Sequence, residues 1–378
     1  MSKVLFVATV VKGHISKFHI PYLKMFQEAG WETAVAARND YESSSDCKIP
    51  FCDTYYDVLF ERSPFKIANI KAFLRLKEIV EQGEYDIIHC HTPVGAILTR
   101  LAAIKARKQG TKVFYTAHGF HFYKGAPLKN WLLYFPAEWL CAHFTDVLVT
   151  INQEDYVLAQ KHMKAKKVAY VPGVGINLEK FGNSSIDVAQ KRNELNIPSD
   201  ALVVLSVGEL IKRKNHQLVI RAIAQMENKN IHYVLAGEGG EREQLLALST
   251  QLGIQDRVHL LGYRTDINEL VGASDIFCLP SIHEGLPVAL MEAMARGMPC
   301  AVSRIRGNID LIDEKGGTFF SVDSVQECES AILDLTNADR TQMRQHNTNV
   351  IRGYSLETVL EKMRNLYDLE MRNKDASI

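Results

Sequence analysis

The sequence predicts an α/β protein made of two doubly wound parallel-sheet domains. Short apolar runs of strand length alternate with segments of helical length over residues 4–171, and the same alternation returns over residues 202–303. Uninterrupted apolar strands joined by helices are typical of parallel sheets that carry helices on both faces. A linker-like passage, residues 172–198, separates the two series. We therefore predict domains over 1–172 and 173–354, facing a cleft lined by the loops that follow the strands.

Each expected strand is a short apolar run followed by a stretch long enough for a helix. In the first domain a helix around 18–29 follows the first strand, and the strands cover 4–11, 33–37, 86–90, 112–116, 146–151 and 167–171. In the second domain the strands cover 202–207, 231–236, 258–261, 275–279 and 300–303. A long polar helix over 355–378 is expected to cross between the domains and to pack back on the first.

The composition is that of a globular chain with no overall charge. The 378 residues include 44 Lys+Arg and 44 Asp+Glu, and 47% are apolar, which excludes a disordered chain, a collagen and a coiled coil. The charge is uneven, because residues 1–172 hold 22 Lys+Arg against 16 Asp+Glu, a net of +6, and the remainder carries −6. Such a distribution concerns partners rather than fold. We expect an anionic partner for the first domain and no nucleic acid.

Cysteine usage and hydropathy indicate the compartment. The seven cysteines form no Cys-x-x-Cys pair, so neither a disulfide framework nor a zinc ribbon is indicated, and a cytoplasmic protein is expected. The first apolar run leads into Lys12 without a small-residue cleavage site, which predicts a buried strand rather than a signal peptide. No uncharged apolar run reaches the roughly 18 residues that a membrane span needs. Any contact with the plasma membrane is therefore expected to be peripheral, at its inner face.

The stretch His283–Glu292 follows a predicted buried strand and opens an apolar helix. Proline suits the first turn of a helix, and the unpaired amides at a helix start form an anion site together with the positive end of the helix dipole. Glu284 lies in the loop at that end, and Glu292 lies about one turn inside the helix. Two carboxylates beside a phosphate site indicate a sugar and a ribose, because a carboxylate accepts hydrogen bonds from vicinal hydroxyls. Taken singly, each is better explained as ordinary surface charge.

Two further loops follow strands of the second domain. Arg213 and Lys214 come after Gly208, and cations at such a turn neutralise a diphosphate leaving group. A solvated basic loop is the alternative explanation. In the next loop Gly237 and Gly239 flank a glutamate, and glycine permits a ligand to approach the backbone closely. An ordinary glycine turn explains that loop equally well.

Histidines mark the strand ends of the first domain. His118 ends the strand 112–116, where an imidazole hydrogen-bonds a sugar or polarises a reacting group, and His14 ends the first strand in the same way. A lone histidine is more often structural, and packing at a strand end explains His89 and His91 equally well. No Asp-x-Asp and no cluster with metal-ligand spacing occurs in the sequence. We therefore predict no metal.

Together these motifs resemble the retaining glycosyltransferases of family 4, whose GT-B architecture joins two Rossmann-like domains. The resemblance covers nearly the whole chain, and its most specific element is Glu284-x7-Glu292. The upstream pattern Gly208…Lys214 supports it, and 237–239 and 116–119 lie in the expected order. The chain looks most similar to the capsular and exopolysaccharide branch of that family.

The resemblance implies a role for each motif. Glu284 contacts the hydroxyls of the donor sugar, Lys214 with Arg213 stabilises the departing diphosphate, and His118 touches the transferred sugar. Glu292 binds the ribose. The other donor-binding residues that it implies are Gly13, Gly208, Gly237, Glu238, Tyr263, Arg264, Gly285, Leu286, Pro287 and Val288; the acceptor side is formed by His14, His118, His121 and Lys124.

The sequence departs from the family pattern at two positions. Many members have an arginine directly after the glycine of the Gly208 motif, where this chain has Glu209. Stabilisation of the leaving group then rests on Lys214 and Arg213. The loop after the first strand has a single glycine, Gly13, where a pair is frequent, which weakens the expectation of phosphate contact from that side.

The resemblance implies transfer of a hexosyl unit from a nucleotide diphosphate sugar, a UDP-hexose or a UDP-N-acetylhexosamine, with retention of configuration and without a metal or other cofactor. The expected acceptor is a lipid-diphosphate-linked glycan in bacterial cell-surface polysaccharide biosynthesis. No convincing nucleophilic carboxylate is evident, so attack on the face from which the diphosphate departs is preferred to double displacement. Two alternatives remain open: a nucleotide-sugar epimerase of related fold, and a noncatalytic partner subunit.

Residues 62–77 form a basic stretch without an acidic residue. Lys66, Lys71 and Arg75 alternate there with large apolar residues, and an aromatic-rich segment, 120–139, follows in the same domain. This composition suits an amphipathic helix that rests on anionic lipid. A helix packed in the core with a solvated basic face is the alternative.

Overall fold

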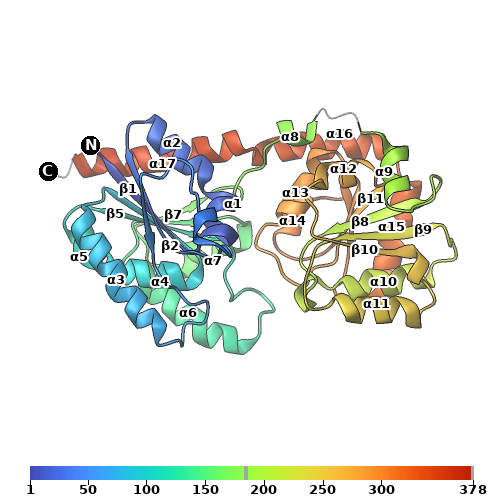
Figure 1. Cartoon of the computed structure of the whole chain (residues 1–378), viewed down its shortest axis with the longest axis horizontal. Coiled ribbons are helices and arrows are strands. Elements are labelled where there is room, and N and C mark those ends of the chain that lie inside the picture. Colours follow the sequence, from blue (N-terminus) through green and yellow to red (C-terminus); the bar gives the residue numbers. More distant parts are fainter. Residues whose placement is uncertain (183–185, 376–378) are drawn as a thin grey trace. The chain divides into compact units, whose positions relative to one another are not determined.

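The computed structural model describes residues 1–182 and 186–375, and the chain divides into two compact units. Unit 1 comprises Met1–Val174 with Val359–Ile378, and unit 2 comprises Gly175–Thr358. Residues 376–378 of the predicted terminal helix lie outside the described residues. Each unit contains one sheet with helices around it (Figure 1).

Unit 1 contains a seven-stranded parallel sheet in the order β3-β2-β1-β4-β5-β6-β7. The sheet is doubly wound, since β1 lies between β2 and β4 and the chain proceeds outward to both edges. Helices cover both faces, so the central strands bury nearly every side chain. The strands are β1 (Lys3–Val10), β2 (Glu32–Arg38), β3 (Thr54–Asp57), β4 (Ile87–His91), β5 (Lys112–Ala117), β6 (Val147–Thr150) and β7 (Lys167–Tyr170).

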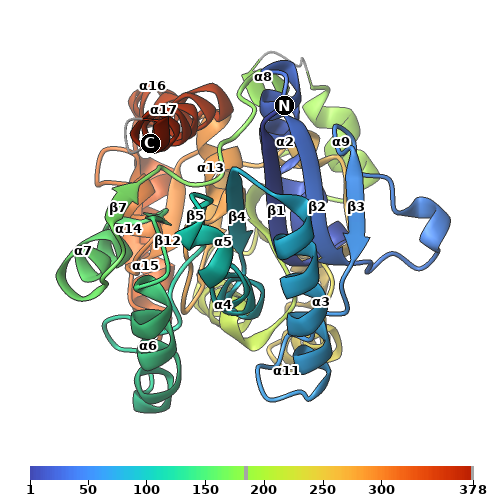
Figure 2. The same cartoon turned by 90° about the vertical axis from the view of Figure 1, so that its left-hand side faces the viewer.

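Two apolar clusters hold the helices of unit 1 against the sheet. One face packs against α2 (Ile20–Glu28) and α17 (Leu356–Asp375), and the other against α3 (Ala68–Gly83), α4 (Pro93–Ala102) and α6 (Leu128–Ala142), as Figure 2 shows. The shorter elements are a π-helical turn (Val11–Ile15), α1 (Ser16–Phe18), α5 (Ile104–Lys108) and α7 (Gln153–His162).

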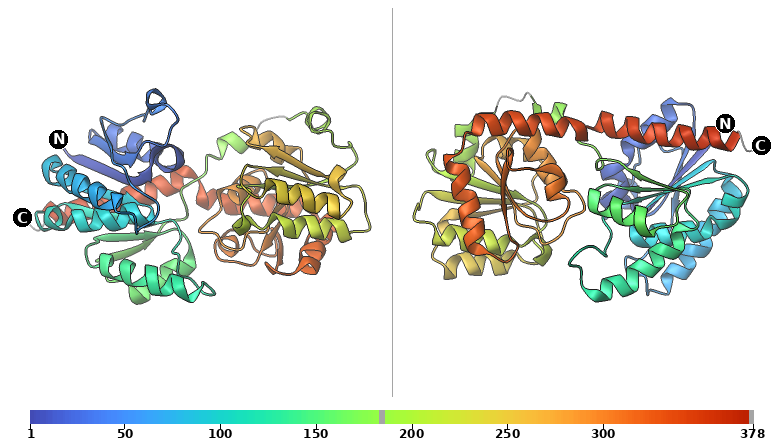
Figure 3. Two further views of the ribbon diagram at one scale, coloured as in Figure 1. Left: turned by 60° about the horizontal axis from the view of Figure 1, so that its bottom comes forward. Right: turned by 180° about the vertical axis from the view of Figure 1, so that it is seen from behind.

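Helix α17 is one continuous helix whose residues from Val359 onward belong to unit 1 (Figure 3). Tyr367 anchors it to the sheet: the Tyr367 hydroxyl lies 2.6 Å from Nδ1 of His89, and its ring packs on Phe114 with centroids 4.8 Å apart. The C-terminal segment therefore completes the core of unit 1 although 184 residues of unit 2 precede it in the chain.

Unit 2 contains a six-stranded parallel sheet in the order β10-β9-β8-β11-β12-β13. Its strands are β8 (Leu202–Val207), β9 (Ile231–Ala236), β10 (Val258–Gly262), β11 (Ile276–Leu279), β12 (Cys300–Ser303) and β13 (Gly317–Phe320). Its helices are α8 (Glu179–Gly182), α9 (Val188–Glu194), α10 (His216–Gln225), α11 (Arg242–Gln251), α12 (Ile267–Gly272), α13 (Val288–Ala295), α14 (Asn308–Leu311), α15 (Val325–Asn337) and α16 (Arg340–Ile351).

The two parallel sheets confirm the predicted fold class, and each predicted strand is present to within one residue at either end. Strands β3 and β13 were not predicted; both are short strands at sheet edges with partly exposed side chains. The prediction of a linker over 172–198 was wrong in part, because α8 and α9 lie there. Arg192 of α9 is buried and bonds the Asp275 carboxylate at 2.9 Å, so this segment is an integral part of unit 2.

A buried ion pair joins α4 to α6 in unit 1. Arg100 Nη2 donates to Glu138 Oε2 at 2.8 Å, and the Tyr115 hydroxyl donates to Glu138 Oε1 at 3.1 Å. The Arg100 guanidinium also lies over the Tyr115 ring, 4.1 Å from its centroid. Both charged side chains are almost fully buried, so each depends on the other for compensation.

We predict that Arg100→Leu lowers the free energy of unfolding of unit 1 by about 3–5 kcal/mol, because it leaves the Glu138 carboxylate buried without its cation. Urea unfolding followed by circular dichroism measures the loss. The double variant Arg100→Leu/Glu138→Leu should recover most of it. A loss below about 1 kcal/mol in the single variant would contradict this account.

Candidate active site

In unit 2 the candidate residues lie on loops that leave the carboxyl ends of neighbouring strands. Strand β8 pairs with β9 on one side and with β11 on the other, all in parallel, so the loops after these three strands emerge at one edge of the sheet. The register places Leu205 beside Phe277. This edge is where open α/β sheets bind ligands.

The Glu284 carboxylate is held between two cations. Lys214 Nζ donates to its Oε1 at 2.6 Å, and Arg213 Nη1 lies 3.2 Å from its Oε2. Arg213 also donates to the backbone carbonyl of His283 at 2.8 Å, which fastens the loop after β8 to the loop after β11. Glu284 is 7% exposed. Burial alone would raise the pKa of its carboxyl group, but attraction to Lys214 and Arg213 outweighs burial and holds the pKa below its ordinary value.

Helix α13 begins directly after this carboxylate. Pro287 is the N-cap residue, one position before the first helical turn where it was expected. Among the described residues, no acceptor engages the backbone amides of Leu286, Val288 and Ala289. The backbone at Gly307 packs closely against this loop, since a Cβ at Gly307 would lie only 2.5 Å from the Gly285 carbonyl oxygen. The helix start thus presents free amides beside two cations, an arrangement suited to phosphate oxygens.

Glu292 lies on α13, half-buried, with no ion-pair partner among the described residues. Burial raises the pKa of its carboxyl group to about 7, and the charge of Lys180 opposes that rise only weakly. Hydrogen-bond donors of a ligand, such as a pair of hydroxyls, would stabilise a half-buried carboxyl group that lacks an ion-pair partner.

The glycines after β8 and β9 have a structural role that the sequence did not reveal. A Cβ at Gly237 would lie 1.8 Å from the Gly208 carbonyl oxygen, and one at Gly239 would lie 2.4 Å from the Leu210 carbonyl oxygen. These glycines therefore let the two loops pack backbone against backbone. Gly208 itself lies close to Lys214, whose Cε would be 3.3 Å from a Cβ there.

The remaining candidates of unit 2 differ in their surroundings. Glu209 and Glu238 are exposed, and Tyr263 is exposed to the extent of 74%. The Arg264 guanidinium is already paired with Asp266 and with Glu194, which holds it in a surface ion cluster. Glu209, Glu238 and Tyr263 are therefore accessible to a ligand, whereas the Arg264 guanidinium is already paired.

In unit 1 the fold brings histidines together from three distant segments. Ring nitrogens of His14, His19, His91 and His118 lie within 4.8 Å of one another. Nδ1 of His91 lies 3.3 Å from Nε2 of His118. Both ring nitrogens of His19 are buried without a hydrogen-bond partner among the described residues. His19 was not among the predicted site residues, because no metal-ligand spacing connects positions so far apart in the chain.

Burial lowers the pKa of these imidazoles. It lowers the pKa of His118 to about 4 and that of the neighbouring His89 to about 3, so both rings are neutral at pH 7. Neutral imidazoles donate and accept hydrogen bonds from sugar hydroxyls and also coordinate metals. The four rings form the group among the described residues that could hold a metal ion. The absence of a metal requirement stays a prediction.

The other candidates of unit 1 follow strands β1 and β5 in the chain. The backbone amide of Gly13 donates to Asp40 Oδ2 at 3.1 Å, and the backbone amide of Lys12 donates to Oδ1 of the same carboxylate. Asp40 therefore occupies the two amides that a phosphate would need. Lys124 is exposed, and the His121 ring stacks on Tyr134 with centroids 4.5 Å apart.

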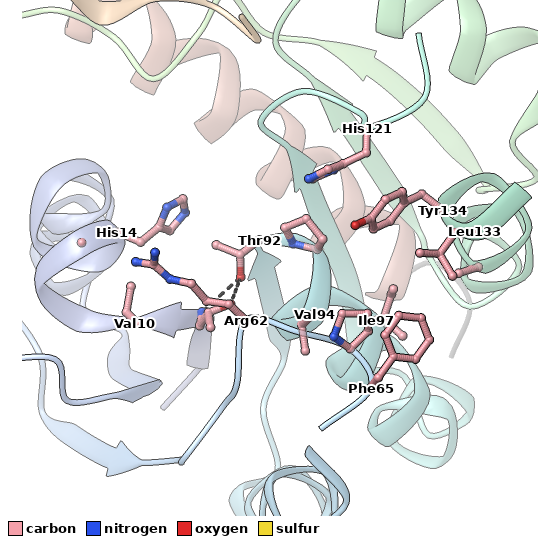
Figure 4. Close-up of a pocket in the computed structure, with 15 residues that line it drawn as sticks. Val10, His14, Arg62, Phe65, Thr92, Val94, Ile97, His121, Leu133 and Tyr134 are labelled. Carbon is pink, nitrogen blue, oxygen red and sulfur yellow. Dashed lines mark hydrogen bonds between the residues drawn. The ribbon is translucent and has the colours of Figure 1, made fainter. Parts of the chain in front are cut away.

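A cavity of about 530 Å³ opens in unit 1 beside His14 and His121 (Figure 4). Residues from the loop after β1, the segment before α3, the start of α4 and the helix α6 line it. The Thr9 and Thr92 hydroxyls, 2.6 Å apart, join the end of β1 to the start of α4 at its floor.

Two family models match this chain. The model described as "Glycosyl transferase 4-like" matches residues 3–152, and the model described as "Glycosyl transferases group 1" matches residues 187–350. The protein EpsD of Bacillus subtilis (strain 168) is 36% identical over 100% of this chain and 99% of its own length. The chain belongs to the family 4 glycosyltransferases.

A second relative and a solved structure are similar over most of the chain. The UDP-Gal:alpha-D-GlcNAc-diphosphoundecaprenol alpha-1,3-galactosyltransferase of Escherichia coli is 29% identical over 80% of each chain. The crystal structure of Anabaena HepE in complex with UDP and glucose has a TM-score of 0.80 at 20% identity, covering 97% of this chain and 100% of the other. These likenesses confirm the GT-B architecture predicted from the sequence. Within the described ranges, no helix has the length and apolar character of a membrane span.

We predict that the stability of unit 2 falls as the pH rises from about 5 to 8, because the unfolded chain ionises Glu292 near its ordinary pKa of 4.5 whereas the folded chain does so near 7. The loss attributable to this group is on the order of 2 kcal/mol. Urea unfolding at the two pH values measures it. Glu292→Gln is the control and should lose less stability over the same range; equal losses would contradict the assignment.

Proposed function

We propose that this protein is a retaining glycosyltransferase that transfers a hexose or N-acetylhexosamine from a UDP-sugar to a lipid-diphosphate-linked glycan. The arrangement of Lys214, Arg213 and Glu284 at the start of α13 carries the proposal, because it joins cations and free amides for phosphates with a carboxylate for hydroxyls. Membership of the family and the UDP in the HepE structure support a nucleotide-sugar donor.

Each group then has a task in the transfer. The bond between the anomeric carbon and the diphosphate oxygen breaks, and the diphosphate keeps the electron pair. Lys214 and Arg213 stabilise the charge that develops there, while Glu284 orients the sugar through its hydroxyls. Glu292 binds the ribose hydroxyls, and Tyr263 lies beside the base.

The acceptor hydroxyl attacks the anomeric carbon on the face that the diphosphate leaves, and its proton passes to the departing phosphate oxygen. This route needs no carboxylate nucleophile, no metal and no cofactor, and it retains the anomeric configuration. His118 of unit 1 hydrogen-bonds the transferred sugar as a neutral imidazole, the state in which burial holds it.

The acceptor proposal draws on the charge of unit 1 and on one relative. The E. coli relative acts on a diphosphoundecaprenol-linked sugar. Residues 1–172 of this chain carry a net charge of +6, which suits a diphosphate acceptor and an anionic surface. We place the protein in bacterial cell-surface polysaccharide biosynthesis on these grounds.

We predict that Lys214→Ala reduces kcat for sugar transfer by about 10²–10³-fold, because the leaving diphosphate loses its principal cation. The measurement is UDP release across a panel of UDP-sugars with a lipid-linked oligosaccharide as acceptor. Lys212→Ala is the matched control, since Lys212 is an exposed lysine two positions away without a partner among the described residues.

Near-wild-type turnover by Lys214→Ala would contradict the leaving-group assignment. Conversion of the donor sugar in the absence of acceptor would identify an epimerase instead. Failure of every UDP-sugar in the panel to release UDP in an acceptor-dependent manner would overturn the proposed function.

We further propose that unit 1 rests on the inner membrane surface through α3 and the residues before it. Lys66 and Lys71 are exposed there without ion-pair partners among the described residues, whereas Arg75 pairs with Glu78 on the helix surface. Large apolar side chains on the same segment are also exposed: Phe65, Ile67, Ile70 and Leu74. Helix α3 packs on the sheet through Ala72, Leu76 and Ile79, so the exposed apolar side chains lie outside its packed face, which favours contact with lipid.

We predict that replacing Lys66, Lys71 and Arg75 by Glu abolishes sedimentation with vesicles that contain anionic lipid, because the attraction reverses sign. A control triple variant at Lys48, Lys161 and Lys164 changes the net charge of unit 1 equally at exposed positions elsewhere and should still bind. Binding that is insensitive to salt or to lipid charge would contradict the proposal.

A further inference from the structure

The cavity of unit 1 has two chemically different ends. In Figure 4, Val94, Ile97, Phe65 and Leu133 gather at one end, and the Arg62 side chain extends toward the other end, where His14 lies. At about 530 Å³ the cavity falls within the roughly 300–1,000 Å³ that small-molecule sites occupy. The catalytic groups proposed above use neither the apolar end nor Arg62.

The apolar end continues into an exposed apolar rim. Phe65 lines the cavity on one side although it is 73% exposed, and Leu133 lines it on the other side at 42%. The same two segments carry further large exposed apolar side chains: on the segment before and within α3, Ile67, Ile70 and Leu74, and on α6, Leu128, Leu132, Trp139 and Leu140. Exposed apolar side chains on two segments that both line one cavity are typical of a binding or membrane surface.

The polar end offers positive charge and unsatisfied donors. Arg62 is exposed, and neither an ion pair nor a hydrogen bond holds its guanidinium within the described residues. Nε2 of His14 is buried without a partner there. Arginine matches the oxygens of a phosphate through its planar array of donors.

We infer that this cavity binds the first isoprenoid units of a polyprenyl diphosphate acceptor, with the diphosphate at Arg62 and the chain leaving across the rim of α3 and α6 into the membrane. This inference rests on the proposed function and adds where the lipid part of the acceptor binds. A polyprenyl diphosphate joins an apolar chain to an anion end to end, which matches the two ends of the cavity. The basic residues along the rim, Lys66 and Lys71, fit an anionic membrane better than a second protein.

The buried ion pair between Arg100 and Glu138 gives the cavity fixed walls. The pair joins α4 to α6. Arg100 lies about one turn after Ile97 on α4, and Glu138 directly follows Ala137 on α6; Ile97 and Ala137 both line the cavity. A preformed apolar wall lowers the ordering cost of binding a flexible chain. Affinity should therefore depend on the length of the isoprenoid.

The experiment measures binding of isopentenyl, geranyl and farnesyl diphosphate by calorimetry to the full chain. We expect farnesyl diphosphate to bind at least about tenfold more tightly than isopentenyl diphosphate, because each added isoprenoid unit buries further methylene and methyl groups. Ala137→Trp, which fills the cavity from α6, should remove this gain. Arg62→Ala should weaken all three ligands by a similar factor.

Val157→Trp is the matched control, since it adds the same side chain to an exposed position of α7 that neither lines the cavity nor belongs to the apolar rim. It should behave as the wild type. Ile97→Trp fills the cavity from α4 and should repeat the effect of Ala137→Trp, so a folding defect confined to α6 does not decide the result. Equal affinity for the three diphosphates in the wild type, or a full chain-length gain in both filled variants, would overturn the inference.

This outcome is separable from that of the proposed function. Chain-length-dependent binding without acceptor-dependent UDP release would preserve the lipid site and reject the transferase assignment. UDP release with a lipid-linked acceptor that is equally fast in the wild type and in Ala137→Trp would preserve the transferase and reject the lipid site.

Discussion

The buried carboxylate of Glu284 is the constraint on which the rest of the candidate site in unit 2 depends. A carboxylate that is almost removed from water must be paired, and the two cations that pair it come from the loop after β8, seventy residues earlier in the chain. Their contact is possible because β8 and β11 are adjacent parallel strands whose carboxyl ends share one edge. The same contact holds the cations, the carboxylate and the amides of α13 together before a ligand binds. Such preorganised groups can stabilise negative charge that develops during a reaction.

Unit 1 solves a different problem with buried polar groups. Its histidines lie near the strand ends in neutral form, and its ion pair between Arg100 and Glu138 stiffens two helices that expose apolar rather than charged side chains. Burying this charge pair costs desolvation free energy, and neither residue has a proposed catalytic role. We infer that the pair instead fixes the wall of the cavity between a polar site and a lipid surface. Under the functions that we propose, unit 2 binds the phosphates of the donor and unit 1 binds those of the acceptor, with arginine or lysine at each place.

The strands and most of the donor motif could be predicted because their signals are local. A buried parallel strand is an apolar run, and the start of the helix that follows it forms an anion site. Glu284, Lys214 and the turn at Pro287 could therefore be identified from the sequence. Strands β3 and β13 carry weaker signals because neither contains an aliphatic residue, whereas the edge strands β7 and β10 do. The glycines at 237 and 239 were assigned to ligand approach, yet they also serve the packing of two loops. Sequence alone does not distinguish a ligand from a neighbouring backbone at a glycine.

By itself, then, the sequence determined the fold class, the family motifs and the uneven charge, since periodicity, motif spacing and composition are properties of the linear chain. The tertiary structure decided which of those residues meet. The pairing of Glu284 with both cations, the gathering of four histidines from three segments and the cavity between α4 and α6 all depend on strand order and helix packing. Contacts between residues tens of positions apart are fixed by the register of the sheet, and no local pattern encodes that register.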